Sequence, residues 1–344
     1  MSMIIQRLQS HTVSIYHLTD DYLEEKLVDA RSLLVSSRFD LYAKLYYIGM
    51  RKENQAEAER VYNEHIKVFN PDLKEPGRDD KNGYDDFVHS FNLLIDEFES
   101  QEFDSSVSLV PVTEEGVILD GAHRVAALAY YDKKVGIALC KGVKQKANFN
   151  YKYFRDRGLS WSTMDIVALE MVRWVPNMYV ACLWPKMEDK SRARALIEKH
   201  FGIVYEKKLK VNLKSFQSLI KRVYDNQPWV SEPNSVKFKS LQCYGFNGQI
   251  QFLFFCANSL DKVLAVKEQI RSIYDVGKHS LYITDSVEET RALSKEVLDE
   301  TVRDVWNPSS TVDGLKNQIE ERWFYFKNVQ WINMKVAVAK ILKK

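Results

Sequence analysis

The amino-acid sequence predicts an α+β protein with more than one domain. The chain has 344 residues, which is more than one hydrophobic core usually organises. Long stretches carry apolar residues at helical spacing, and short β-branched or aromatic runs such as Val117–Leu119 and Ile250–Ala257 separate them. We expect four segments: an N-terminal helical segment (1–70), an α/β domain (71–150), a helical connector (151–235) and a C-terminal α/β domain with a basic terminal helix (236–344).

Charge and cysteine usage exclude several classes of protein. The 49 Lys and Arg residues nearly balance 47 Asp and Glu residues, so no broad basic field favours nucleic acid as a partner. No apolar run approaches the roughly 18–20 residues of a transmembrane helix. The cysteines have no metal-binding spacing and no signal peptide precedes them, which predicts a cytoplasmic protein. They are Cys140, Cys182, Cys243 and Cys256.

Three helices are expected in the N-terminal segment. The first begins at about Tyr22 after a possible cap in Thr19-Asp20-Asp21. The others run from about Phe39 to Ile48 and from about Asn54 to Phe69, where Asn70-Pro71 ends the pattern. The helix from about Tyr22 is expected because the apolar residues that follow it recur at helical spacing: Leu23, Leu27, Ala30, Leu33 and Leu34.

A polar loop, a helix and three short strands are expected next. The helix runs from about Tyr84 to Glu99, after the polar loop from Pro71 to Gly83. Val107–Val112 and Val117–Leu119 read as a hairpin around Glu114-Glu115-Gly116, and Val135–Cys140 as a further strand.

The turn Asp120-Gly121-Ala122-His123-Arg124 is the candidate site. It links a strand to an Ala-rich helix, and Gly121 permits a backbone conformation that other residues resist. Free N–H groups and the helix dipole favour an anion at such a point. Arg124 adds a guanidinium fork suited to phosphate. The sequence therefore predicts a phosphate site.

The order of these elements resembles the ParB/sulfiredoxin superfamily over roughly Asp72 to Cys140. The resemblance implies that the turn, through Gly121, Ala122, His123 and Arg124, binds nucleotide phosphates. It also makes three residues of the preceding loop binding candidates, which are Glu75, Arg78 and Lys81. Two features differ: Ala122 stands where sulfiredoxins carry a cysteine, and no helix-turn-helix module follows the domain. The whole arrangement also resembles proteins encoded in bacterial surface-polysaccharide clusters.

These observations predict a transferase that uses a phosphorylated donor, either ATP or a sugar donor of the phosphoribosyl diphosphate type. The resemblance to polysaccharide-cluster proteins implies a saccharide acceptor. His123 would donate to a phosphate oxygen or act as acid or base, and Asp120 would orient His123 or bind Mg²⁺ that arrives with the donor. The alternative class is a ParB-like nucleotide-dependent DNA-binding protein or a nuclease.

The last third predicts a β-α-β-α unit with parallel strands. Strands at Ile250–Ala257 and His279–Thr284 alternate with helices at about Leu260–Tyr274 and 286–298. Ligands bind beyond the carboxyl ends of such strands, which makes Asp285 a second catalytic candidate. The competing interpretation is that Asp285 and Ser286 only cap the following helix.

The C-terminal segment, residues 322–344, is basic and aromatic. It contains Trp323, Phe326 and Trp331 and has no acidic residue after Glu321. Such a helix can lie on an anionic membrane surface or dock on the protein with its lysines in water.

Overall fold

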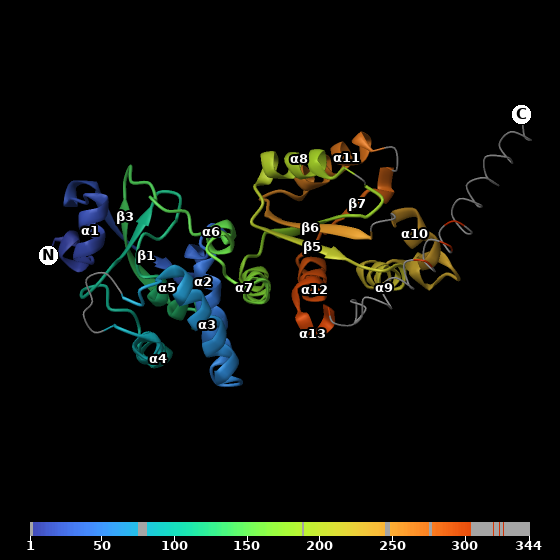
Figure 1. The fold of residues 1–344 in the computed structure, drawn as a ribbon. Helices are drawn as coiled ribbons and strands as arrows, with labels where there is room; N and C mark the ends of the chain where they lie inside the picture. The colour runs from blue at the N-terminus through green and yellow to red at the C-terminus, as the bar shows by residue number, and fades with distance from the viewer. Residues whose placement is uncertain are drawn as a thin grey trace, which may run out of the picture. The chain divides into compact units, whose positions relative to one another are not determined.

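The computed structural model divides the chain into two compact units, Met1–Val175 and Pro176–Lys344. Figure 1 shows a small sheet with surrounding helices in each unit. The structure describes residues 3–74, 81–187, 189–244, 248–274 and 277–303, together with Ile319, Trp323 and Phe326. This architecture confirms the predicted α+β class.

Unit 1 is built on a three-stranded sheet in the order β1-β3-β2. β3 is antiparallel to β1 and parallel to β2, so α5 forms the crossover between the parallel pair. The predicted hairpin is present as a short return of the chain, in which the Thr113 and Leu119 amides donate to Val117 and Pro111 carbonyls. The strands are β1 (Leu23–Asp29), β2 (Val110–Thr113) and β3 (Lys134–Cys140).

Helices cover this sheet. Val13 of α1 and Leu18, which follows this helix, pack with Ala138 and Cys140 of β3, and Figure 1 shows α1 and α5 on opposite sides of the sheet. Local sequence explains the helix starts, because Asn54 caps α3 and Ser160 caps α7 through their side chains. The helices are α1 (Ser10–Tyr16), α2 (Asp40–Met50), α3 (Gln55–Phe69), α4 (Tyr84–Ser100), α5 (Ala122–Tyr130), α6 (Tyr151–Asp156) and α7 (Trp161–Trp174), with 3₁₀ turns η1 (Ile4–Arg7), η2 (Asp20–Tyr22) and η3 (Ala30–Leu33).

The helix expected from Tyr22 is wrong, because this stretch forms β1 and the turn η3. β1 is an edge strand whose residues Leu23 to Asp29 pair with Cys140 to Lys134. Most of its side chains face solvent, and Leu27 is 62% exposed, so no period-2 apolar pattern marks the strand. The segment 1–70 is therefore not an all-helical segment, since its strand completes the sheet of the segment that follows.

Unit 2 is built on a four-stranded sheet in the order β5-β6-β4-β7, in which all neighbours are antiparallel. This order, with one helix between β4 and β5 and another between β6 and β7, is that of a split β-α-β unit. β6 and β7 run in the same direction, as predicted, but β4 lies between them. The strands are β4 (Met178–Leu183), β5 (Tyr205–Lys210), β6 (Gln249–Cys256) and β7 (Leu281–Ile283).

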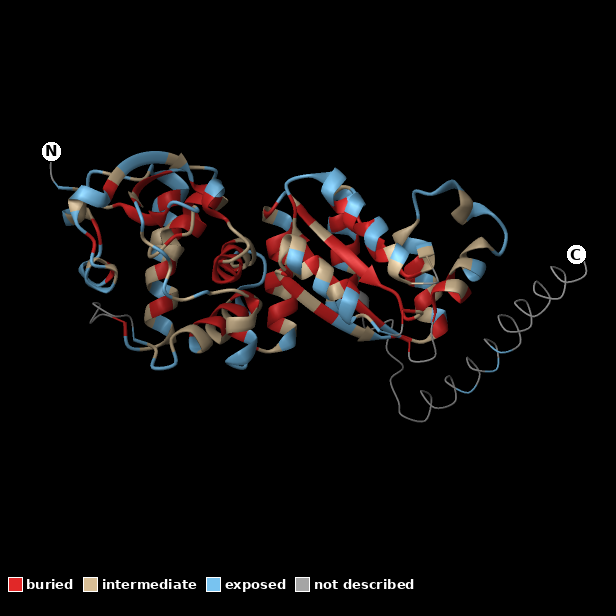
Figure 2. Ribbon diagram, turned by 90° about the horizontal axis from the view of Figure 1, so that it is seen from above, coloured by how far each residue is buried: buried red, intermediate tan, exposed pale blue. Residues whose placement is uncertain are grey.

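The predicted helical connector is also wrong in part, because residues 151–235 contribute both β4 and β5 to this sheet. α8 and α11 cover one face, where Leu183, Leu253 and Ile270 share a buried core, and α12 lies on the other face (Figure 1). The central strands β4 and β6 are largely buried (Figure 2). Gly202 ends α8 as expected. The helices are α8 (Ser191–Phe201), α9 (Leu213–Val223), α10 (Ser235–Cys243), α11 (Leu260–Ile273), α12 (Val287–Leu298) and α13 (Glu300–Arg303), with 3₁₀ turns η4 (Pro228–Ser231) and η5 (Gly277–His279).

Candidate functional site

The turn Asp120–Arg124 lies where the return strand of the hairpin meets the N-terminus of α5. Gly121 is the residue before the helix and has φ +82°, a left-handed conformation. A Cβ at this position would lie 2.9 Å from Arg124 Nη2 and 3.2 Å from Val110 Cγ2. The backbone conformation therefore favours glycine, and a larger residue would also displace the Arg124 side chain.

The first turn of α5 is suited to an anion. No side chain caps the helix at Gly121, and no acidic residue lies in its first turn. Its first amides are thus left to water or a ligand, at the positive end of the helix dipole. Arg124 packs beneath the turn with its side chain 17% exposed, and Asp120 lies 3.5 Å from its guanidinium.

His123 is held by aromatic side chains from two other helices. Its Nε2 atom lies 2.9 Å from the Tyr62 hydroxyl, and its ring meets Phe91 edge-on at 4.7 Å. Tyr62 comes from α3 and Phe91 from α4, and both are buried. Desolvation, with the positive charges of Lys44 and Lys81, lowers the pKa of His123 well below its ordinary value. The imidazole is therefore neutral at pH 7 and serves as a hydrogen-bonding group.

A buried ionic cluster lies beside this turn, and the sequence analysis missed it. Arg38 binds both carboxylate oxygens of Asp40 at 2.8 Å and also donates to the Ile118 carbonyl of the return strand. Lys44 lies 3.3 Å from the same carboxylate. These cations hold the pKa of Asp40 well below its usual range, so it stays ionised. The Asp40–Lys44 spacing of four was a visible signal for an ion pair on a helix, but its burial was not.

The loop candidates are only partly described. Lys81 is 8% exposed and its ammonium group lies 5.1 Å from the centre of the Phe87 ring. Its positive charge contributes to the lowered pKa of His123. Glu75 and Arg78 lie outside the described residues.

A resident metal ion does not fit the described residues. They contain no group of three or more His, Cys, Asp and Glu side chains arranged to hold one. Asp120 is a single carboxylate whose partner is Arg124. That Asp120 binds Mg²⁺ arriving with a phosphorylated donor stays a prediction.

Asp285 belongs to unit 2, after β7 and before α12, whereas Asp120–Arg124 belongs to unit 1. Ser286 caps α12 by accepting from the Glu289 amide, as the capping interpretation expected, and the Glu289 carboxylate accepts from the amide of Asp285, the residue before the cap. The Asp285 side chain itself is 48% exposed, 4.0 Å from Lys267. The Asp285 carboxylate therefore does not cap α12 and can contact a ligand.

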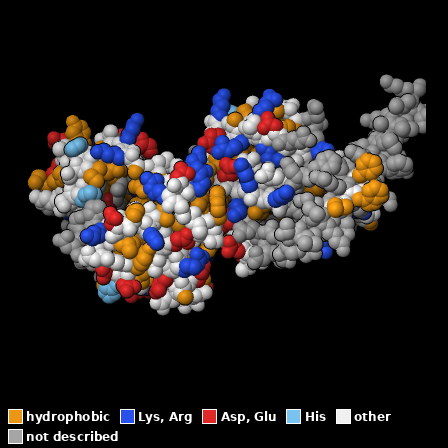
Figure 3. Space-filling model, in the orientation of Figure 1, with side chains coloured by type: hydrophobic (Ala, Val, Ile, Leu, Met, Phe, Trp, Pro, Cys, Tyr) orange, Lys and Arg blue, Asp and Glu red, His pale blue; other side chains and the backbone are white. Residues whose placement is uncertain are grey.

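Surface charge is mixed, and basic and acidic side chains are interspersed over the described residues on the face drawn in Figure 3. Within the described part of the chain, no helix has the length and apolar character needed to cross a bilayer. The proposed membrane contact of residues 322–344 lies outside the described residues apart from Trp323 and Phe326, which are exposed.

No family model, no curated protein and no solved structure matches this chain.

Proposed function

We propose that unit 1 binds the phosphate groups of an anionic donor at the N-terminus of α5, and that the protein is a transferase using this donor. The donor is ATP or a sugar donor of the phosphoribosyl diphosphate type, with Mg²⁺ as its counter-ion. The acceptor is a saccharide. The resemblance of Asp120–Arg124 to the ParB/sulfiredoxin turn supports the nucleotide or pyrophosphate class of ligand.

One observation carries the proposal, which is an uncapped helix start with a guanidinium group and a neutral imidazole in its first turn. No side chain caps α5 at Gly121 and no acidic residue lies in its first turn. The Arg124 side chain is 17% exposed and lies 3.5 Å from Asp120. Amide groups at a helix N-terminus together with a guanidinium are the donors that phosphate oxygens accept from.

The residues suggest a division of roles. Amides of the first turn and the Arg124 guanidinium would bind phosphate oxygens. In the tautomer in which the Tyr62 hydroxyl donates to Nε2, neutral His123 would carry its proton on Nδ1 and could donate it to a phosphate oxygen. When pyrophosphate or a transferred phosphoryl group develops negative charge, these fixed donors would stabilise it.

The test is donor binding by Arg124→Gln, measured by titration calorimetry with MgATP and with phosphoribosyl diphosphate. Loss of charge-assisted hydrogen bonds should weaken binding about ten- to a hundredfold. Arg155→Gln is the matched control, because Arg155 is an exposed arginine of unit 1 paired with its neighbour Asp156. Equal affinity in the two variants, or no binding of either donor by the unaltered protein, would exclude the proposal.

Turnover is tested separately by following consumption of each bound donor after a panel of monosaccharides and oligosaccharides is added. A salt-dependent DNA-binding assay on the same protein tests the rival class, since phosphate-backbone contacts weaken steeply with salt. DNA binding that requires nucleotide, with no donor consumption, would favour the ParB-like alternative over the transferase.

A further inference from the structure

Unit 2 contains a pocket that has no part in the phosphate site. It has a volume of about 220 Å³ and lies among the end of α9, the turn η4, β7, the second half of α11 and the start of α12. This volume is below the roughly 300 Å³ at which pockets for drug-sized ligands begin. The pocket therefore suits a small molecule with about one ring.

Aromatic side chains form one wall of this pocket. Tyr224 lies between Trp229 and Tyr282, with ring centres 5.2 Å and 5.1 Å apart. Tyr282 is 8% exposed, whereas Tyr224 and Trp229 are only partly buried, so their rings are accessible from the pocket. Partly open aromatic faces bind the apolar C–H side of a small ring.

The rest of the lining is polar and carries charges of both signs. Its charged residues are Asp285, Glu289, Lys267 and Arg271, and Arg271 also forms an ion pair at 2.6 Å with Glu268, which is not part of the lining. Lys267 lies 4.0 Å from Asp285 and also donates to the Ile283 carbonyl. Glu289 accepts from the Tyr282 hydroxyl at 2.6 Å.

Some hydrogen-bonding groups of these polar residues have no partner or face solvent. The Arg271 Nε–H is buried and has no partner among the described residues. Half of the Asp285 side chain is exposed, and exposed Asn226 and Gln227 complete the rim. Planar amide, carboxylate and guanidinium groups offer paired donors and acceptors, which match adjacent hydroxyl groups.

We propose that this pocket binds an uncharged polyhydroxyl ring, that is, one saccharide unit, stacked on Trp229 and hydrogen-bonded to Asp285, Arg271 and the amide rim. A phosphate is disfavoured because two carboxylates line the pocket, and an organic cation because Lys267 and Arg271 do. The proposal depends on this pocket alone; with the proposed function, its ligand would belong to the acceptor.

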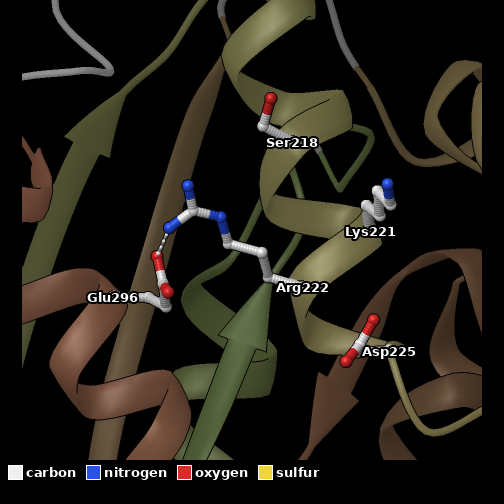
Figure 4. Close-up of a pocket in the computed structure, with 5 residues that line it drawn as sticks. All are labelled: Ser218, Lys221, Arg222, Asp225 and Glu296. Carbon is white, nitrogen blue, oxygen red and sulfur yellow. Dashed lines mark hydrogen bonds and ion pairs between the residues drawn. The ribbon is translucent and has the colours of Figure 1, made fainter.

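A larger pocket of unit 2, of about 510 Å³, lacks these properties. Ser218, Lys221, Arg222 and Asp225 from α9 and its end, with Glu296 of α12, line it (Figure 4). Figure 4 shows Arg222 directed at Glu296, with which it forms an ion pair, while Lys221 points away. No aromatic side chain is among these residues, so we assign no ligand to it.

The experiment measures sugar binding by the full chain in the absence of any donor. Saturation-transfer NMR with methyl glycosides of glucose, galactose, mannose and ribose identifies a ligand, and calorimetry gives its affinity. Trp229→Ala should weaken binding at least about tenfold through loss of stacking. Asp285→Asn, which preserves shape, should weaken it about three- to tenfold.

Two control variants keep the outcomes distinct. Phe238→Ala removes an aromatic side chain of unit 2 that is 54% exposed and outside the pocket, and it should bind like the unaltered protein. Arg124→Gln should also bind sugar normally, which separates this proposal from the donor site. Circular dichroism checks that each variant folds.

Three results would overturn the proposal: no glycoside binds, Trp229→Ala and Asp285→Asn both bind as well as Phe238→Ala, or glycine competes with the sugar. The last result would show a zwitterion site, in which Asp285 and Arg271 bind opposite charges. Sugar binding that falls in both pocket variants, and in neither control, supports the proposal whatever the donor assays show.

Discussion

Replacing Gly121 by alanine tests whether the turn positions Arg124 for an anion. The alanine would have to adopt φ +82°, and its Cβ atom would lie 2.9 Å from Nη2 and 3.2 Å from Nε of Arg124. The left-handed conformation costs about 1–2 kcal/mol for an L-residue. The contact with Arg124 adds little to this cost, because the far end of a flexible side chain can move, whereas buried Val110, with its Cγ2 atom 3.2 Å away, must shift by a few tenths of an ångström. We therefore expect a modest loss of stability but at least about a tenfold loss of donor affinity.

Gly116→Ala is the matched control. Gly116 has φ +80°, and a Cβ there meets nothing within 4 Å. Both variants should lose about 1–2 kcal/mol in urea unfolding, followed by a probe in unit 1, because both pay the same backbone cost. Only Gly121→Ala should lose MgATP or phosphoribosyl diphosphate binding in calorimetry. If the two variants bind alike, Arg124 does not contact the donor from its present position.

Three further substitutions test the surroundings of the turn. Burial lowers the pKa of His65, whose ring has no hydrogen-bond partner among the described residues. The free energy of unfolding therefore decreases as the pH falls below the pKa that this histidine has in the unfolded chain. His65→Phe should remove up to about 1.4 kcal/mol of that loss per pH unit below about 6.5, measured by urea unfolding across this range, and an unchanged pH dependence would contradict it. Arg38→Leu leaves Asp40 with one buried partner fewer and should cost about 3–5 kcal/mol in the same assay; a cost below about 1 kcal/mol would show that Lys44 alone suffices. Tyr62→Phe keeps the ring stack but frees His123, and should weaken donor binding about fivefold by calorimetry, whereas unaltered affinity would remove Tyr62 from the site.

Much of the helical structure could be predicted because its signals are local. Asn54, Ser160 and Ser286 each cap the helix that follows them, and Gly202 ends another. These effects depend on neighbours within one helical turn, so the sequence contains them.

The sheets could be predicted only in part, because strand pairing depends on distant residues. β1 and β5 are edge strands with many charged side chains, and neither has the apolar alternation of a half-buried strand. β4, in the centre of its sheet, was missed between two helices of the expected connector. Their partners lie at least 39 residues away along the chain, as in the pairing of Leu23 with Cys140 and of Lys210 with Gln249.

The sequence by itself determined the local form of the candidate site. Gly121 and the Ala-rich helix after it specify a left-handed turn and an uncapped helix start, and Arg124 lies one turn into that helix. Only the tertiary structure decided which groups surround this turn. Three other helices supply these groups: Tyr62 belongs to α3, Phe91 to α4, and the Arg38–Asp40–Lys44 cluster to α2 and the residues just before it. Together they determine the charge state and the hydrogen bonding of His123. Burial and through-space charge depend on packing between distant segments, and a single sequence does not encode them in its spacing.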